Sequence, residues 1–188
     1  MSAAPRTVPL RRAVVGLALA GAAIVAGSCA SATRSTPPDE LRVLVYNIHA
    51  GKDAAGVDNL ERVAALVRDT KADVVLLQEV DRLTTRSGNV DQLAELERRT
   101  GFHGAFGKTL DYQGGDYGIA LLSRWPIRSD TLLRLPIDPP QARAGGSYEP
   151  RGALVARVAM PGRELRVINT HLDASREDHY RRQEVILT

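Results

Sequence analysis

The sequence predicts an α/β domain in which helices lie outside a pair of mainly antiparallel sheets. The first observation is a strand–helix–strand unit in residues 41–81, where two short apolar runs flank an amphipathic segment. The second is a pair of β-patterned runs, residues 153–160 and 164–170, separated by the hairpin signal Pro161-Gly162. The chain has 188 residues, of which 44% are hydrophobic, and this suits one globular domain with its own core.

The strand–helix–strand unit places two polar side chains after its apolar runs. Residues 41–46 and 73–77 are the runs, and Asn47 and Glu79 follow them. The segment between them repeats its apolar residues at i, i+3, i+4 and i+7, which is one face of a helix: Leu60, Val63, Ala64 and Val67. Because the strand ends of such a unit lie close together, Asn47 and Glu79 are expected to close the two strands and to share one cleft.

Capping signals indicate where two helices begin. Asp58 is expected to cap the first helix, and Glu61, three residues later, to complete a capping box. Residues 81–89 are polar and predict a loop at the cleft, after which Asn89 is expected to cap a second helix with Gln92 three residues on. This second helix should turn two leucines inward and end at a glycine: Leu93, Leu96 and Gly101.

Glycine, proline and β-rich segments organise the second half of the chain. Residues 110–116 contain two adjacent glycines and predict a loop, while residues 117–123 predict a strand that ends before Pro126. Residues 136–150 contain four prolines and two glycines and form the longest irregular stretch. The charged residues 176–187 predict the start of a helix. The chain shows no internal repeat.

The N-terminal segment has the features of an export signal. It begins with three basic residues, Arg6, Arg11 and Arg12. Residues 13–27 are an uncharged apolar run, which is shorter than a typical membrane-spanning helix. We therefore interpret residues 1–28 as an export signal, which predicts that the protein acts outside the cytoplasm. Residues 29–40 are rich in Ser, Thr and Pro and are interpreted as a tether, which leaves residues 41–188 as the domain.

Cys29 leaves the form of export open. It is the only cysteine and directly follows Ala26-Gly27-Ser28, which resembles a bacterial lipobox and predicts lipidation of its thiol. The alternatives are a plain secretory peptide cut after Ala32, giving a secreted or periplasmic protein, or a retained anchor. A single cysteine forms no internal disulfide.

The net charge becomes neutral once the export signal is set aside. The whole chain has 25 Lys and Arg against 22 Asp and Glu, a formal charge of +3. Three of the arginines lie in the signal, whereas every acidic residue follows position 38. A neutral domain argues against binding dominated by contacts to a phosphate backbone, although it allows phosphate chemistry at one site.

Five stretches, in this order and spacing, resemble motifs of the endonuclease/exonuclease/phosphatase superfamily, which has the DNase I-like fold. The resemblance covers nearly all of the chain after its N-terminal segment and implies a four-layer α/β/β/α sandwich whose second half is incomplete here. The stretches are Val-Tyr-Asn47-Ile-His, Leu-Leu-Gln78-Glu79-Val-Asp81, Tyr117-Gly-Ile-Ala-Leu-Leu-Ser123-Arg-Trp-Pro126-Ile127, Glu149-Pro-Arg151-Gly-Ala-Leu and Asn169-Thr-His171-Leu-Asp173.

Glu79 is the expected metal ligand. A carboxylate at the end of a buried apolar strand is poorly solvated and needs a metal or a cation, so a structural ion pair with an arginine is the alternative. The resemblance implies that Glu79 binds Mg²⁺, with Mn²⁺ as the second choice. It also implies that Asn47 lies beside the metal and the scissile phosphate, as a second metal-site residue and a catalytic residue. A turn residue at a strand end is the other interpretation of Asn47. Zinc is disfavoured because only His171 and His179 lie close together in this region and no cysteine joins them.

The resemblance also implies residues that contact the phosphate and the rest of the substrate. Arg151 offers a fork that matches phosphate oxygens, and His171 can donate a hydrogen bond to a phosphoryl oxygen as a catalytic residue. Tyr117, His49 and Asp173 are further candidates for substrate binding, although Tyr117 could equally be a packed strand aromatic.

These residues predict a metal-dependent phosphoester hydrolase, of phosphodiesterase or nuclease type, acting on nucleic acid or a phospholipid head group. A lipid anchor would add contact with a membrane, and no protein partner is indicated. The alternative is an inactive remnant or a phosphate-binding module, because the family's later Gly-Asp-x-Asn and Ser-Asp-His motifs are absent. Asp178-His179 comes too early in the chain to replace them. We therefore expect a truncated hydrolase that expresses poorly and lacks metal-dependent activity.

Overall fold

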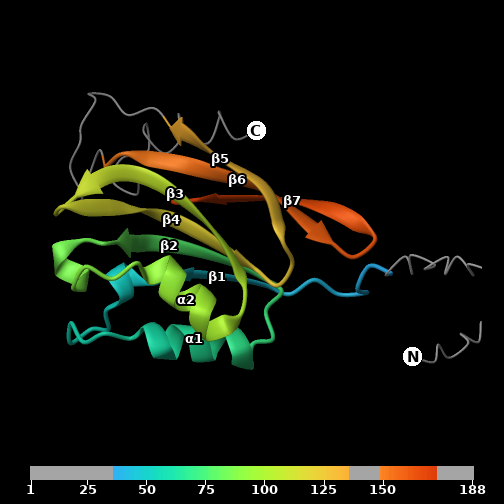
Figure 1. Ribbon diagram of the computed structural model, residues 1–188, viewed down its shortest axis with the longest axis horizontal. Helices are drawn as coiled ribbons and strands as arrows, with labels where there is room; N and C mark the ends of the chain where they lie inside the picture. The colour runs from blue at the N-terminus through green and yellow to red at the C-terminus, as the bar shows by residue number, and fades with distance from the viewer. Residues whose placement is uncertain (1–35, 136–148, 173–188) are drawn as a thin grey trace, which may run out of the picture. The chain divides into compact units, whose positions relative to one another are not determined.

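The structure is a computed structural model, and it describes residues 36–135 and 149–172 (Figure 1). Seven strands, two α-helices and two short 3-10 helices make up the described residues. In chain order they are β1 (Val43–Asn47), η1 (His49–Gly51), α1 (Leu60–Asp69), β2 (Val74–Arg82), η2 (Thr85–Ser87), α2 (Gln92–Thr100), β3 (His103–Tyr112), β4 (Gly115–Ser123), β5 (Ile127–Leu135), β6 (Arg151–Met160) and β7 (Arg163–Thr170).

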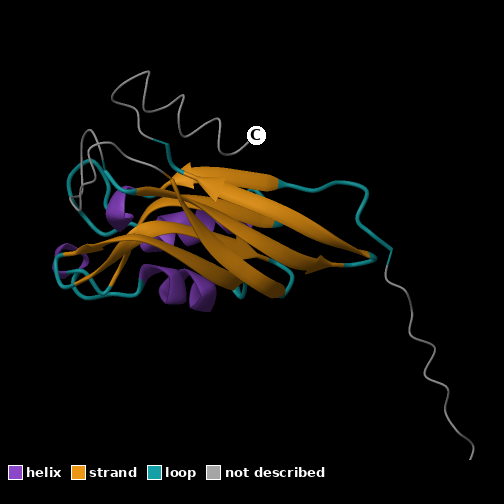
Figure 2. Ribbon diagram, turned by 90° about the horizontal axis from the view of Figure 1, so that it is seen from above, coloured by secondary structure: helices purple, strands orange, loops and turns teal. Residues whose placement is uncertain are grey.

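The strands form two sheets, one covered by helices. The first sheet has the order β1-β2-β4-β3 and the second the order β5-β6-β7. Only β1 and β2 are parallel, since the helix α1 connects them, and all the other pairs are antiparallel. The two sheets stack face to face, and α1 and α2 cover the outer face of the first (Figures 1 and 2). The fold is therefore a DNase I-like α/β sandwich, as predicted, of which the described residues supply an α/β/β set of layers. The predicted helix in residues 176–187 lies outside them.

Two apolar cores hold these layers together. The predicted face of α1 is buried against the first sheet: Leu60, Val63, Ala64 and Val67 are at most 2% exposed. The second core lies between the sheets and is built from alternate residues of β4 and β6: Ile119, Leu121, Leu154, Ala156 and Val158. Successive residues of the first sheet point to opposite faces. This sheet therefore contributes side chains both to the core under the helices and to the core between the sheets.

The capping of α1 differs in part from the sequence prediction. Asp58 Oδ1 accepts the backbone N–H of Leu60 at 3.2 Å, so this carboxylate does satisfy a free donor at the helix start. Glu61 does not reach back to close a capping box. Its carboxylate pairs instead with Arg68 at 3.0 Å and with Arg99 of α2. The predicted capping box is thus wrong, because two arginines compete for the Glu61 side chain.

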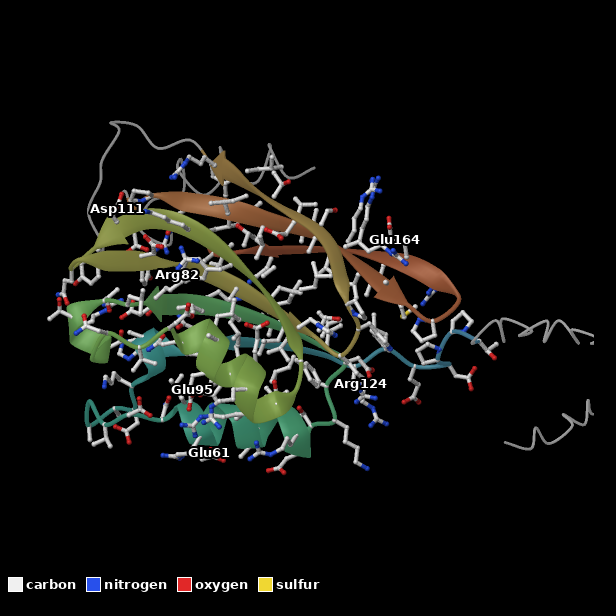
Figure 3. The ribbon with its side chains drawn as sticks, viewed as in Figure 1. Glu61, Arg82, Glu95, Asp111, Arg124 and Glu164 are labelled. Atoms are coloured by element: carbon white, nitrogen blue, oxygen red, sulfur yellow. The ribbon has the colours of Figure 1, made fainter. Side chains whose placement is uncertain are left out.

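The cap of the second helix is Asp91, two residues later than the predicted cap Asn89. Asp91 Oδ1 accepts the N–H of Ala94 at 3.0 Å, whereas Asn89 adopts the left-handed region with φ of 57°. Gly101, with φ of 73°, ends the helix as predicted. The two helices are also linked by charge, since Arg99 pairs with Glu95 at 2.7 Å as well as with Glu61. Figure 3 labels these two carboxylates on the neighbouring helices.

Two strands were not predicted. Residues 110–116 form the β3–β4 hairpin rather than a loop, with Gln113 and Gly114 at positive φ in its two-residue turn. The other unpredicted strand, β5, begins directly after Pro126, which lies beyond the strand predicted for residues 117–123. Charged residues interrupt the apolar alternation of β5, and a bulge interrupts the register of both strands, so neither has a regular period of two. The hairpin formed by β6 and β7 was predicted correctly.

The expected export signal and the lipidation site Cys29 lie outside the described residues. Residues 36–40 of the expected tether carry no helix or strand. Over residues 36–135 and 149–172, no helix is long and apolar enough to cross a membrane. The expectations about export and anchoring therefore stay predictions.

A buried asparagine joins the two sheets at one end. Asn169 of β7 is 2% exposed and donates its amide N–H groups to the carbonyls of Leu77 at 2.9 Å and Ala120 at 2.8 Å. Its Oδ1 accepts a hydrogen bond from Gln78 Nε2 at 2.9 Å. Asn169 therefore ties β7 of the second sheet to β2 and β4 of the first.

Asn169→Ala should destabilise the fold more than a typical buried substitution. It removes three hydrogen bonds, and a buried polar group left unsatisfied costs about 1–3 kcal/mol, so we expect the free energy of unfolding to fall by about 3 kcal/mol. Gln78→Ala loses one of these bonds and should cost less, and the double variant should cost less than the sum. Urea unfolding measures these values, and wild-type stability for Asn169→Ala would contradict the role of this residue.

Candidate active site

Glu79 projects from a bulge in β2 rather than from the end of the strand. β2 continues to Arg82, which corrects the expectation that Glu79 closes it. The pairing of β2 with β4 shifts between Leu77 and Val80, and Glu79 has a φ of 56°. A bulge of this kind re-aims a side chain. Glu79 is consequently partly exposed, with 24% of its side chain accessible, although its neighbours in the strand are buried.

Asn47 lies beside Glu79, as the sequence predicted. β1 and β2 are parallel and in register, with Asn47 opposite Gln78. Asn47 Nδ2 donates to Glu79 Oε1 at 2.7 Å, and its Oδ1 accepts the backbone N–H of His49 at 2.9 Å. Both ends of the amide are therefore engaged, and the amide nitrogen faces the carboxylate.

His171 approaches the same carboxylate oxygen from the second sheet. Its Nε2 lies 3.5 Å from Glu79 Oε1, and it follows the buried Asn169 by two residues. The contact with His171 is the main reason that the pKa of Glu79 falls to about 2, with a smaller lowering from the Asn47 hydrogen bond and from His49. Partial burial opposes this shift. The Glu79 carboxylate is thus ionised at neutral pH.

A buried ion pair lies nearby on the strand that begins at Arg151. Arg151 Nη1 donates to Glu149 Oε1 at 2.7 Å, and the two residues are 9% and 3% exposed. Within the described residues, Arg151 Nε is buried and has no hydrogen-bond partner. The sequence analysis placed Glu149 in the same motif as Arg151 but did not predict their pairing, for which the spacing of two residues was the only signal.

Tyr117 connects the ion pair to Glu79. It is 5% exposed, and burial raises the pKa of its phenol, helped by the negative charges of Glu149 and Glu79. Both carboxylates are thus close enough to act on the phenol. Tyr117 is therefore a packed strand aromatic whose phenol is influenced by Glu79, and its contact with substrate stays a prediction.

A network that the sequence did not reveal supports Tyr117 from the side of β2. Asp81 is fully buried and accepts two hydrogen bonds of 2.8 Å from Arg86 and one of 2.7 Å from Thr84. The Arg86 guanidinium lies over the rings of Tyr112 and Tyr117, 4.5 and 5.3 Å from their centroids. The predicted loop over residues 81–89 is wrong in part, because Asp81 and Arg82 belong to β2 and Thr85–Ser87 form η2. The sequence did not indicate that the buried Asp81 holds this segment through Arg86.

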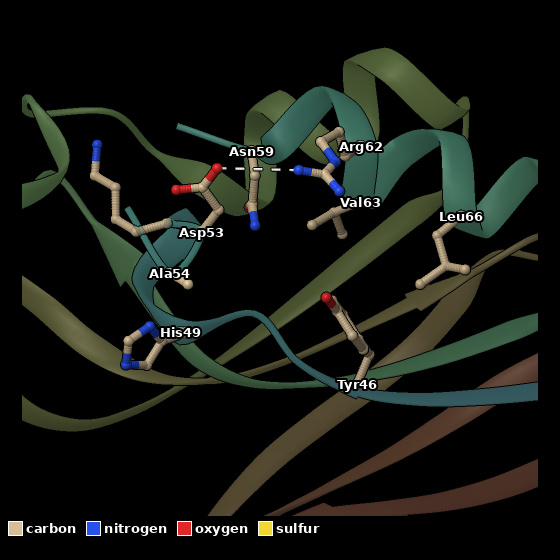
Figure 4. Close-up of a pocket in the computed structure, with 9 residues that line it drawn as sticks. Tyr46, His49, Asp53, Ala54, Asn59, Arg62, Val63 and Leu66 are labelled. Carbon is tan, nitrogen blue, oxygen red and sulfur yellow. Dashed lines mark ion pairs between the residues drawn. The ribbon is translucent and has the colours of Figure 1, made fainter. Parts of the chain in front are cut away.

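His49 lies between Glu79 and an open pocket. Figure 4 shows the pocket between β1 and α1, with an ion pair of 3.9 Å between Asp53 and Arg62 at its rim. His49 and the next residue, Ala50, have φ of 52° and 54°, a strained conformation held by a 2.7 Å hydrogen bond from the buried Gln92 to the Ala50 carbonyl. The lining residues are Tyr46, His49, Lys52, Asp53, Ala54, Asn59, Arg62, Val63 and Leu66.

The donors at Glu79 fit a hard divalent cation better than zinc. Mg²⁺ typically takes one or two carboxylates and keeps several waters, so one ionised, partly exposed carboxylate is a suitable anchor. A closed zinc site needs about four N or S ligands. The described residues contain no group of three or more His, Cys, Asp or Glu that could hold a metal ion of any kind, so Glu79 would bind a cation as a single carboxylate. Asp173, the last predicted contact, lies outside the described residues.

The stacked sheets with helices outside define a DNase I-like α/β fold, and comparison with known families gives the same result. A model of the Endonuclease/Exonuclease/phosphatase family matches residues 44–187, so the chain belongs to this family. The match includes all the predicted site residues except the lipidation site Cys29.

Solved structures with the same fold extend the comparison. The endonuclease/exonuclease/phosphatase from Beutenbergia cavernae has a TM-score of 0.59 and 28% identity, over 70% of this chain and 38% of that chain. D. rerio TDP2 complexed with single strand DNA product has a TM-score of 0.56 and 16% identity, over 80% and 53%. The mannosyl-6-phosphatase of Bacteroides thetaiotaomicron has a TM-score of 0.58 and 14% identity, over 79% and 57%. The chain thus spans less than two thirds of each of these proteins.

Arg151→Met should destabilise the protein because it removes the cation that faces the buried Glu149 carboxylate. Losing one partner of a buried ion pair costs about 3–5 kcal/mol, and Glu149→Gln in the same chain should restore part of this loss by removing the buried charge. Arg98→Met, which breaks an exposed pair with Glu95, is the control and should cost less than about 1 kcal/mol. Thermal or urea unfolding measures all three, and equal effects of the two arginine substitutions would argue against a buried pair.

Proposed function

We propose that the chain is a divalent-metal-dependent phosphoester hydrolase, of phosphodiesterase or nuclease type, that acts outside the cytoplasm. The observation that carries this proposal is the ionised Glu79 carboxylate, held 2.7 Å from Asn47 Nδ2 and 3.5 Å from His171 Nε2. Membership of a family whose name covers endonucleases, exonucleases and phosphatases supports it. The Arg151 guanidinium, which like Glu79 acts electrostatically on the Tyr117 phenol, adds a group suited to phosphate.

Glu79 would hold the metal, with Mg²⁺ the first choice and Mn²⁺ the second. Such an ion neutralises charge on phosphoryl oxygens and orients the substrate. Asn47 fixes the direction of the carboxylate, since its amide nitrogen bonds to Glu79 while its oxygen is held by the His49 backbone. Direct ligation by Asn47 would require its oxygen to leave that hydrogen bond.

The remaining residues would bind and polarise the phosphate. Hydrolysis adds the oxygen of water to phosphorus and breaks the bond from phosphorus to the leaving oxygen. Arg151, whose Nη1 is bonded to Glu149 and whose side chain is 9% exposed, would offer its remaining accessible guanidinium N–H to the phosphate. His171 would donate a hydrogen bond to a phosphoryl oxygen as its negative charge grows. Tyr117, His49 and Asp173 complete the proposed substrate contacts.

A phosphate- and metal-binding protein without turnover is the second candidate. The observation that favours it concerns the general base that an attacking water needs. In the described residues, Asp81 is occupied by Arg86 and Glu149 by Arg151, so neither carboxylate is placed to take a proton. A catalytic version of this site would need a base from elsewhere in the protein.

We propose phosphodiesters as the class of substrate. TDP2 was solved with a single-stranded DNA product and another neighbour is a mannosyl-6-phosphatase, so the same fold serves substrates of different kinds. A neutral domain and an export signal favour extracellular nucleic acid or a phospholipid head group. Assays of phosphate-ester cleavage on DNA, RNA and sphingomyelin would separate these substrates.

Glu79→Gln should weaken Mg²⁺ binding more than about tenfold, because a metal-site carboxylate contributes more than the outer contacts that tune such sites. Glu95→Gln, at an ion-paired carboxylate on α2, is the matched control and should leave the affinity unchanged. Isothermal titration calorimetry measures both. A wild-type isotherm for Glu79→Gln, or no Mg²⁺ binding by the wild type, would contradict the metal assignment. If Mg²⁺ binds but no phosphodiester is cleaved, the second candidate is favoured.

The membrane attachment proposed for Cys29 has its own test. A lipidated protein should partition into the detergent phase of a cell extract, and Cys29→Ser should move it to the aqueous phase or block its processing. Aqueous partitioning of the wild type would indicate simple secretion. A fully cytoplasmic wild type would contradict export.

A further inference from the structure

Arg86 is fixed through both its side chain and its backbone. Its guanidinium donates two hydrogen bonds of 2.8 Å to the fully buried Asp81 carboxylate, which also accepts from Thr84 at 2.7 Å. Its backbone N–H donates to Gln113 Oε1 at 3.0 Å, in the turn of the β3–β4 hairpin. A guanidinium that faces a carboxylate through two donors has one good orientation, and leaving it would strand a buried charge. The direction of the Arg86 guanidinium is therefore set.

The guanidinium of Arg86 in turn packs against two tyrosine rings. Its Cζ lies 4.5 Å from the ring centroid of Tyr112 and 5.3 Å from that of Tyr117. The two rings meet edge to face, with centroids 6.2 Å apart and planes at 60°. A cation within about 6 Å of an aromatic face is attracted to it. Arg86 thus restricts the orientation of the Tyr117 ring, which is itself only 5% exposed.

The orientation of Tyr117 matters because its hydroxyl lies at the ion pair of Arg151. The Glu149 carboxylate forms a hydrogen bond with the Tyr117 hydroxyl and one of 2.7 Å with Arg151 Nη1. A carboxylate that accepts from two donors is oriented by both. A displaced phenol would therefore loosen Glu149, and with it the direction of the Arg151 guanidinium. The contacts form one chain: Asp81, Arg86, Tyr117, Glu149 and Arg151.

We propose that Arg86 is a positioning residue for phosphate binding. It fixes the Tyr117 phenol, which orients the Glu149 carboxylate. The oriented carboxylate then aims the guanidinium of Arg151 at the phosphate of the substrate. This role rests on the proposed function, in which Arg151 binds phosphate. Because Arg86 acts through the tyrosine, its loss should weaken phosphate binding and leave the Mg²⁺ affinity of the protein unchanged.

Arg82, labelled in Figure 3, is a matched control, because it makes the same kinds of contact with a different ring. It pairs with Asp116, and its Cζ lies 4.6 Å from the ring centroid of Phe106. Its side chain is 38% exposed, against 33% for Arg86. A substitution of Arg82 therefore removes a cation, an ion pair and a cation–π contact, while the contacts of Tyr117 with Arg86 and Glu149 stay in place.

Isothermal titration calorimetry of the full chain with inorganic phosphate, in the presence of Mg²⁺, tests the proposal. Arg86→Met should weaken phosphate binding about fivefold or more, which corresponds to the loss of one cation–π contact. Arg82→Met should bind phosphate like the wild type, and Mg²⁺ should bind equally to all three proteins. Since Arg86→Met leaves the Asp81 charge unpaired, the double variant Asp81→Asn/Arg86→Met is measured beside it and should show the same loss. Circular dichroism confirms that the variants fold.

A double-mutant cycle separates positioning from a general loss of structure. Tyr117→Phe keeps the ring, removes the hydroxyl and should weaken phosphate binding by a similar factor. Because Arg86 acts through that hydroxyl, adding Arg86→Met to Tyr117→Phe should cause little further loss.

Three results would each overturn the role of Arg86 while leaving the phosphate site in place. They are wild-type phosphate affinity in Arg86→Met, equal losses in Arg86→Met and Arg82→Met, and additive losses in the cycle. A wild type that binds Mg²⁺ but no phosphate would instead contradict the proposed function of Arg151, and the role of Arg86 with it.

Discussion

The hydrogen bonds of Asn169 are the constraint on which the rest of this site depends. One buried amide satisfies carbonyls of β2 and β4 and accepts from Gln78, so it fixes the second sheet against the first at the end where the functional side chains gather. Sheets packed only through apolar side chains could slide by small amounts, because dispersion contacts have little directional preference. Directed hydrogen bonds in a buried setting have one good geometry, and they define the distance between the sheets at this point.

Short stretches of chain connect the residues of this junction to the residues of the candidate site. Gln78, which bonds to Asn169, is next to Glu79, and His171 lies two residues beyond Asn169. The bulge then turns Glu79 outward, where His171 from one sheet and Asn47 from the other stabilise its ionised form. Arg86, fixed by the buried Asp81, supports Tyr117 between Glu79 and the Glu149–Arg151 pair. Strain at the bulge and at His49 is thus held in place by buried polar groups close by.

The sequence predicted the parts of this arrangement that depend on local pattern. The helix face around Val63, the strands that carry Asn47 and Tyr117, and the closeness of Asn47 to Glu79 all follow from periodicity and from the strand–helix–strand unit. The bulge at Glu79 could not be predicted, because it depends on pairing with β4, which is distant in sequence. The same holds for the hydrogen bonds of Asn169, which join residues 49 to 92 positions apart. β5 was missed because its apolar alternation is broken by charges that face water.

The central claim is that this junction creates a carboxylate suited to a hard divalent cation. The most direct measurement is a crystal structure of the protein grown with Mn²⁺, in which anomalous scattering locates the metal. The account predicts one strong peak whose nearest protein atom is a carboxylate oxygen of Glu79. A peak centred on another carboxylate, or none near Glu79 in crystals that hold Mn²⁺ elsewhere, would contradict it.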